Sequence, residues 1–147
     1  MMRICGVELT GNDAVISLLT VDNEMFNLPE CRVRRVSCKN PDFANDLQYF
    51  QKTFVQLMKD YQIDTVVIKE RMKKGKFAGG ANGFKLEAVL QMANSNDLKV
   101  VLMSASEQKV HLKHYPLPIT FAETGLKKFQ ETAFVAAFSY YASKHEW

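Results

Sequence analysis

Two glutamates stand where strands of this sequence are expected to end. Glu8 interrupts the apolar run ICGVELTG, and Glu70 follows the apolar run VVIK. An unpaired carboxylate is costly to bury, so each should be paired, hydrated or bound to a cation. Two carboxylates at neighbouring strand ends repel each other unless a cation lies between them, and hard oxygen ligands suit Mg²⁺ or Mn²⁺. We therefore predict a metal site at Glu8 and Glu70. The alternative is that Glu70 pairs with a neighbouring lysine or arginine as an ordinary loop charge.

A third carboxylate could come from the last expected helix. Glu131 lies in its first turns, within FQETAF, and Glu123 in the preceding loop is a second option. A solvated helix charge is the ordinary explanation for Glu131. Three converging carboxylates could hold two metal ions, which activate a water molecule and stabilise the leaving oxygen in phosphodiester hydrolysis. The predicted catalytic and metal-ligating residues are therefore Glu8, Glu70 and Glu131.

A basic, glycine-rich stretch, RMKKGKFAGGANG, begins directly after Glu70. Cationic side chains and glycine amides beside a carboxylate site suit contact with a nucleic-acid phosphate backbone. The stretch does not match GxxxxGK[ST], so no ATP-binding loop is predicted. A solvated, flexible loop is the alternative. The predicted nucleic-acid-binding residues are Lys69, Arg71, Lys73, Lys74 and Lys76.

Length and composition fit an ordinary folded protein. The chain has 147 residues, of which 47% are hydrophobic and 24% charged, and this favours a single domain over residues 1–147. A net charge of +3 favours anionic partners only mildly. The three cysteines lack CxxC spacing, and neither a signal peptide nor an apolar run of the ~20 residues that cross a bilayer is evident. These features favour a reduced, cytoplasmic location and no membrane contact.

Hydrophobic periodicity defines the elements that must position these residues. Strands are predicted over 3–10, 14–21, 31–38, 64–68 and 100–103, the first two joined by the Gly11-Asn12-Asp13 turn. Helices are predicted from an Asn40-Pro41-Asp42 start to Tyr61, across Leu86 to Ala93, over 107–113, and over about 126–143. This β-β-β-α-β-α-β-α order gives an α/β fold with a mixed five-stranded sheet and helices on both faces. Glu8 then lies at the rim formed by the carboxyl ends of the strands, where open α/β sheets place ligands.

This order and these motifs resemble the ribonuclease H-like superfamily, and within it the RuvC-type Holliday-junction resolvases. GVELTG is similar to that family's first strand, GIDPG, whose aspartate binds metal, with Glu8 at the acid position. VVIKE places Glu70 at the family's metal-binding glutamate, and ETAFVAAF is similar to its last helix, which carries aspartates. The chain departs from the pattern in using glutamate at Glu8, in placing Thr132 at the final acid, and in lacking the proline of the first turn. It also looks like a small uncharacterised family of bacterial proteins with this fold.

The resemblance implies a metal-dependent nuclease or resolvase that acts on structured DNA or RNA with Mg²⁺ or Mn²⁺. Resolvases of this kind act as two-fold dimers, so a homodimer is also an expectation. The alternative is a non-catalytic nucleic-acid-binding or protein-interaction module with a degraded metal site. The missing third acid favours the module, whereas the pairing of Glu8 and Glu70 with a basic loop favours the enzyme. The fold alone does not decide between them.

Overall fold

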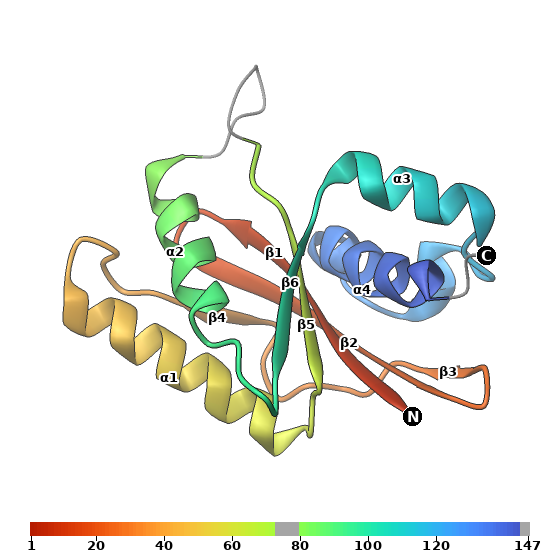
Figure 1. The fold of residues 1–147 in the computed structure, drawn as a ribbon, viewed down its shortest axis with the longest axis horizontal. Helices are drawn as coiled ribbons and strands as arrows, with labels where there is room; N and C mark the ends of the chain where they lie inside the picture. Colours follow the sequence, from red (N-terminus) through yellow and green to blue (C-terminus); the bar gives the residue numbers. More distant parts are fainter. Residues whose placement is uncertain (73–79, 145–147) are drawn as a thin grey trace.

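A computed structural model describes residues 1–72 and 80–144 of the chain. In that part of the chain, six strands form one mixed sheet in the order β3-β2-β1-β5-β6, with β4 also paired to β2 (Figure 1). The strands are β1 (Met2–Thr10), β2 (Asp13–Asp22), β3 (Met25–Asn27), β4 (Arg35–Ser37), β5 (Thr65–Lys69) and β6 (Lys99–Met103). The helices are α1 (Ala44–Asp60), α2 (Ala81–Gln91), α3 (Ala105–His114) and α4 (Glu131–Ser143), with 3₁₀ turns at Phe121–Thr124 and Lys128–Gln130. Strands β5 and β6 run parallel to β1, as the sequence predicts, while β2 runs antiparallel to it.

A tight turn joins β1 to β2. Thr10 pairs with Asp13, which leaves Gly11 and Asn12 as a two-residue loop. Gly11 has a φ of +58°, a conformation that glycine adopts without steric cost. A two-residue loop with glycine first at positive φ matches the right-handed twist of the flanking strands. The predicted hairpin is confirmed, and it carries Glu8 close to the turn.

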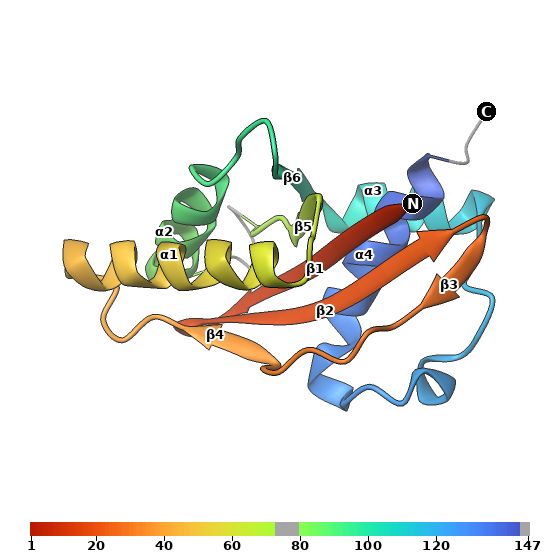
Figure 2. The ribbon, with the colours of Figure 1, turned by 90° about the horizontal axis from the view of Figure 1, so that it is seen from below.

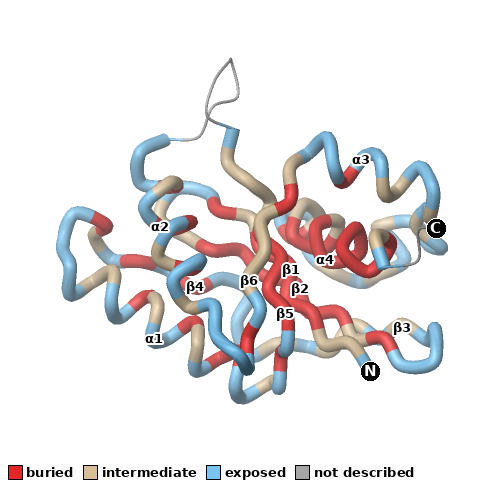
Figure 3. Tube along the Cα trace, viewed as in Figure 1, coloured by how far each residue is buried: buried red, intermediate tan, exposed pale blue. Residues whose placement is uncertain are grey.

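The helices cover both faces of the sheet, as the sequence predicts. Helices α1 and α2 lie over one face, and α3 and α4 lie over the other (Figures 1 and 2). Side chains of β1 alternate between the two faces: Cys5, Val7 and Leu9 pack with α1 and α2, whereas Ile4 packs with α4. The central strands and α4 form the most buried part of the molecule (Figure 3). This alternation places the side chain of Glu8 on the α4 face.

Helix α4 lies directly on β1 because the residues between them are small. A Cβ atom added to Gly6 would lie 1.8 Å from the carbonyl oxygen of Ala133 and 2.9 Å from the amide nitrogen of Ala137. Only glycine therefore allows β1 and α4 to approach this closely. Ala133 and Ala137 are themselves fully buried at this contact.

Two predicted helix starts are wrong. Helix α1 begins at Ala44 because residues 40–43 form a separate turn, in which the Asn40 side chain accepts from Asp42 N–H (3.0 Å) and the Asn40 carbonyl accepts from Phe43 N–H (3.0 Å). Helix α4 begins at Glu131, not near Leu126. The Gln130 side chain accepts from Lys127 N–H (3.1 Å), which stabilises a 3₁₀ turn before the helix.

The predicted strand over 31–38 is present only as β4, and β3 was not predicted, so the mixed sheet has six strands in the described residues instead of five. Strands β3 and β4 lie beside opposite ends of β2 (Figure 2). Continuing the β2–β3 register beyond Thr20 and Asn27 would bring Pro29 opposite Leu18. Proline has no N–H to donate, so pairing stops there and the chain leaves the sheet edge until β4.

The three cysteines should differ sharply in reactivity. Cys5 and Cys38 are buried, and burial raises the pKa of both thiols, whereas Cys31 is partly exposed. Because the thiolate is the reactive form, iodoacetamide should label Cys31 first in the folded protein and all three residues after unfolding in guanidinium. Mass spectrometry of the intact and digested protein measures this. Equal labelling of Cys5 in the folded protein would contradict its burial.

Candidate active-site cleft

Glu8 lies near the carboxyl end of β1, on the face covered by α4. It is partly exposed and pairs with Val15 across the hairpin. On the other side of β1, Val7 pairs with Ile68 of β5, so Lys69 follows at the level of Glu8. The carboxyl ends of the parallel strands β1 and β5 therefore meet at Glu8, as predicted.

Glu70 comes directly after β5 at the same rim. Its backbone N–H donates to the Met103 carbonyl (3.0 Å), which extends the β5–β6 pairing by one residue and fixes the position of the backbone. Glu8 and Glu70 line one cleft of about 360 Å³, together with Leu9, Lys69, Arg71 and Met72. Within residues 1–72 and 80–144, no group hydrogen-bonds to either carboxylate or forms an ion pair with it. The structure thus brings these two acids into one cleft, where neither has a partner among the described residues.

The third predicted acid, Glu131, is not among the residues that line this cleft. Glu131 is the first residue of α4, and its carboxylate pairs with the ammonium group of Lys128. The alternative acid, Glu123, accepts hydrogen bonds from the N–H (3.0 Å) and hydroxyl (2.9 Å) of Thr120, which hold the pKa of Glu123 below its usual range. In the part of the chain that the structure describes, no three acidic, histidine or cysteine side chains are close enough to hold a metal ion. The role of Glu131 as a metal ligand therefore stays a prediction, because the described residues form no such group around it.

Arg71 lines the cleft and also makes hydrogen bonds that connect β1 with α2. Its backbone N–H donates to the Glu87 carboxylate (2.8 Å), and its guanidinium donates to the Leu9 carbonyl. The guanidinium also lies against Gly83, where an added Cβ would come within 2.8 Å of Nε. Arg71 thus ties the end of β1 to the first turn of α2, and only part of it is free to meet phosphate.

Sequence reasoning missed Glu87. Its side chain is only 6% exposed, on the face of α2 that also buries Leu86 and Leu90. A charged residue among buried apolar neighbours was the available signal, because such a group needs a partner. Lys73, Lys74 and Lys76, which were predicted to bind nucleic acid, lie outside the described residues.

Lys69 and Arg71 should respond differently to mutation. Lys69→Ala removes a cation of the cleft that no described carboxylate binds. If Lys69 makes one phosphate contact, the slope of log K for nucleic-acid binding against log[salt] should become shallower by about 0.9. Arg71→Ala should also lower the melting temperature, because it removes the link between Leu9 and α2. Fluorescence anisotropy at several salt concentrations, with thermal melts of both variants, measures this. An unchanged slope in Lys69→Ala would show that Lys69 does not contact phosphate.

Known structures share this architecture. Thermus thermophilus RuvC superposes with a TM-score of 0.72 at 11% identity, covering 98% of this chain and 96% of that one. The same enzyme in complex with a Holliday junction gives a TM-score of 0.69 at 9% identity, covering 99% and 96%. Fowlpox virus resolvase in complex with Holliday junction DNA gives 0.62 at 13% identity, covering 99% and 100%. The fold is therefore ribonuclease H-like and similar to that of RuvC-type resolvases, as predicted, although identities this low carry no information about activity.

The chain belongs to the DUF3010 family, described as a protein of unknown function, whose model matches residues 2–140. A search of curated proteins found no match. Among the helices in residues 1–72 and 80–144, none combines the length and hydrophobicity needed to cross a lipid bilayer.

Proposed function

We propose that this protein is a metal-dependent nuclease that hydrolyses phosphodiester bonds in structured nucleic acid. The observation that carries this proposal is the shared cleft of Glu8 and Glu70, in which neither carboxylate has a partner among the described residues. Two such carboxylates, held at adjacent ends of parallel strands, repel each other unless a cation joins them. Lys69 at the same cleft adds a positive charge suited to a phosphate group.

The donor set fits one hard divalent cation. Mg²⁺ usually keeps several waters and binds through one or two carboxylates together with substrate phosphates, so Glu8 and Glu70 suffice as protein ligands. When bound, such an ion activates a water molecule and neutralises charge that develops on the phosphate oxygens. Glu8 and Glu70 would hold such an ion, and Lys69 would attract the substrate backbone. A pair of protein-held ions has no third carboxylate to support it in the described residues.

Branched DNA is the first substrate class to test. The two complexes with similar folds, from T. thermophilus and fowlpox virus, contain Holliday junction DNA. The cleft lies where the carboxyl ends of β1 and β5 meet, and matched DNA and RNA substrates distinguish between the two nucleic acids. Resolvases of the similar class act as dimers, so the proposal includes a homodimer on a two-fold symmetric junction.

A second candidate function is nucleic-acid binding or protein interaction without catalysis. The ion pair between Glu131 and Lys128 favours it, because this acid is engaged by a lysine at the start of the helix that should supply the last metal ligand. Such a module would use the cleft and its cations for binding alone.

Incubation of the purified protein with labelled four-way junctions, linear duplexes, and matched single-stranded DNA and RNA separates the two functions. We expect cleavage of a branched substrate with Mg²⁺ or Mn²⁺, and none with EDTA. Tight binding without cleavage in either metal would support the non-catalytic module. Cleavage that persists in EDTA would overturn the metal-dependent mechanism.

A further inference from the structure

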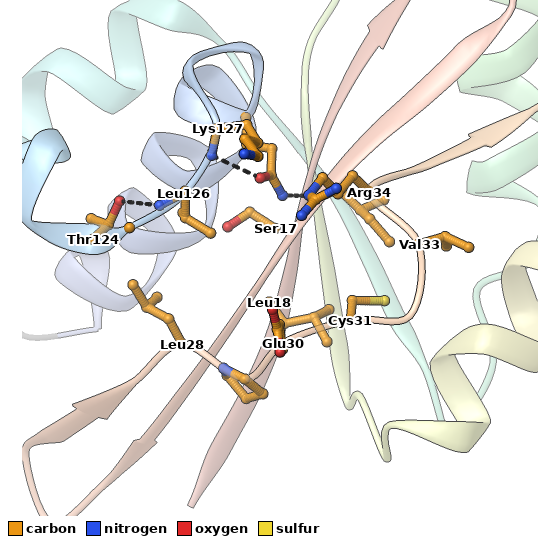
Figure 4. Close-up of a pocket in the computed structure, with 14 residues that line it drawn as sticks. Ser17, Leu18, Leu28, Glu30, Cys31, Val33, Arg34, Thr124, Leu126 and Lys127 are labelled. Carbon is orange, nitrogen blue, oxygen red and sulfur yellow. Dashed lines mark hydrogen bonds between the residues drawn. The ribbon is translucent and has the colours of Figure 1, made fainter.

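A second cavity lies on the outer side of β2, away from the Glu8 cleft. It has a volume of about 200 Å³ and lies between the middle of β2, the segment 28–34 that leaves the sheet edge, and the segment 124–130 before α4. Figure 4 shows Ser17 and Leu18 at its centre, Leu126 and Lys127 to one side, and Cys31 on the other. This volume equals that of roughly seven water molecules in the liquid, enough for one small organic group.

The cavity holds a polar side chain that no group of residues 1–72 and 80–144 satisfies. The Ser17 side chain is 2% exposed, and its hydroxyl has no hydrogen-bond partner in that part of the chain. Buried hydroxyl groups are almost always hydrogen-bonded, so an unpaired one marks a place for a ligand or an ordered water. The neighbouring Gln130 amide donates to the Ile16 carbonyl (2.9 Å) and accepts from Lys127 N–H (3.1 Å), and it makes no hydrogen bond to Ser17.

The cavity also contains Leu18, at a part of the β2 edge that pairs with no other described strand. Ile16 N–H donates outward to the Arg34 carbonyl (3.0 Å), and backbone groups two residues apart on a strand point to the same side. The N–H and C=O of Leu18 therefore also point outward, at a level between the end of the β3 pairing at Thr20 and the β4 pairing at Val15. Together with Ser17, the cavity offers an adjacent donor, acceptor and hydroxyl.

The short length of the free β2 edge limits which ligands can pair with it. A peptide strand would need a longer free edge, but β3 and β4 already occupy β2 on both sides of Leu18. A planar ring with hydrogen-bonding groups along one edge needs only this single site, and Leu28 and Leu126 contribute apolar side chains to the lining. The charged residues of the lining are Arg34, Lys127 and Glu30, which leave a net positive charge for an attached phosphate.

We propose that this cavity binds one unpaired nucleobase, with Arg34 and Lys127 attracting the phosphate beside it. The proposal rests on the proposed function, since it names the feature of nucleic acid that the protein would recognise beyond the backbone. Ser17 pairs with Gly6, and Val15 pairs with Glu8. The same two strands, β1 and β2, therefore carry residues of both the cavity and the Glu8 cleft. The base could come from an extruded nucleotide of a strand or from a free mononucleotide, and the two sources are separable by experiment.

The test compares a DNA duplex carrying one unpaired nucleotide with the same duplex fully paired, by fluorescence anisotropy without divalent metal. We expect the wild-type protein to bind the duplex with the unpaired nucleotide about tenfold more tightly, since a good set of base contacts gives a discrimination of this order. Ser17→Val, which removes the hydroxyl and fills space, should abolish the preference. Thr20→Val makes a similar change on the same strand outside the cavity and should keep the preference. Leu126→Trp, which obstructs the cavity from the loop side, serves if Ser17→Val fails to fold.

Amide resonances of Ser17 and Leu18, followed by NMR while each deoxynucleoside monophosphate is added, identify the source of the base. Shifts at these amides without any preference between duplexes support the same cavity with a free nucleotide as its ligand. Equal affinity for the two duplexes together with unshifted amides overturns the inference while leaving backbone binding intact. Failure to bind either duplex counts against the proposed function instead. In that case the monophosphate titration alone tests whether the cavity binds a nucleobase.

Discussion

Cleavage by the Glu8→Gln variant is expected to be slower than that of the wild-type protein by at least about 100-fold, with nucleic-acid affinity nearly unchanged. Glutamine keeps the size of Glu8 but removes the negative charge that would hold a divalent cation beside Glu70. Because Glu8 accepts no hydrogen bond and forms no ion pair within the described residues, the change should leave the stability of the fold intact. Single-turnover cleavage, anisotropy and thermal melts of the same preparations separate these three effects.

Glu24→Gln is the matched control for this variant. Glu24 lies in the turn after β2, at the opposite end of the hairpin from the Glu8 cleft. The control makes the same chemical change and should keep full activity. Wild-type cleavage rates in Glu8→Gln would exclude Glu8 as a metal ligand, and a parallel loss of affinity would assign it to binding instead.

The Gly6→Ala variant should be the most destabilising single-methyl change in the sheet. The added Cβ would lie 1.8 Å from the Ala133 carbonyl oxygen, which belongs to a helix backbone and cannot rotate away. Relief requires α4 to move off β1 and to loosen the buried contacts of Ala136, Ala137 and Phe138. Overpacking of this kind costs about 3 kcal/mol of the free energy of unfolding, which corresponds to a melting temperature lower by about 10 °C.

Gly80→Ala provides the comparison. An added Cβ at Gly80 meets nothing within 4 Å, and the residue has a φ of −76°, which alanine adopts freely. Its melting temperature should stay within a few degrees of the wild-type value. A Gly6→Ala protein as stable as Gly80→Ala would mean that β1 and α4 are farther apart than the structure places them.

Much of this fold could be predicted because its long elements have clear periods. Phe50, Phe54, Leu57 and Met58 recur at helical spacing, and all are buried where α1 packs on the sheet. The three-residue strands β3 and β4 could not be predicted in the same way, since they are too short to show a period. Their places depend on the register of β2 and on Pro29, which are tertiary features.

Some residues of the candidate site could likewise be placed from the sequence, and others could not. Glu8 and Glu70 could be predicted to share a rim because strand direction alone brings the ends of β1 and β5 together. Glu131 depends on where α4 begins and on how it is rotated about its axis, and neither follows from composition. The helix starts five residues later than the apolar pattern suggests, with Lys128 in position to bind the acid. Ser17 carried no sequence signal, because one serine in a strand is unremarkable until its missing partner is seen.

The contact between Gly6 and α4 also constrains how the molecule folds. Residues more than 100 positions apart meet there, and the Gln130 side chain reaches the Ile16 carbonyl across a separation of 114 residues. Closing such long loops costs chain entropy before any contact repays it, so docking of α4 should be a slow, late step of folding. Until it occurs, Ile4, Leu19 and Val67 lack the apolar contacts that α4 gives them on this face. During synthesis, this face of the sheet therefore stays without α4 until residues 131–143 have been added to the chain.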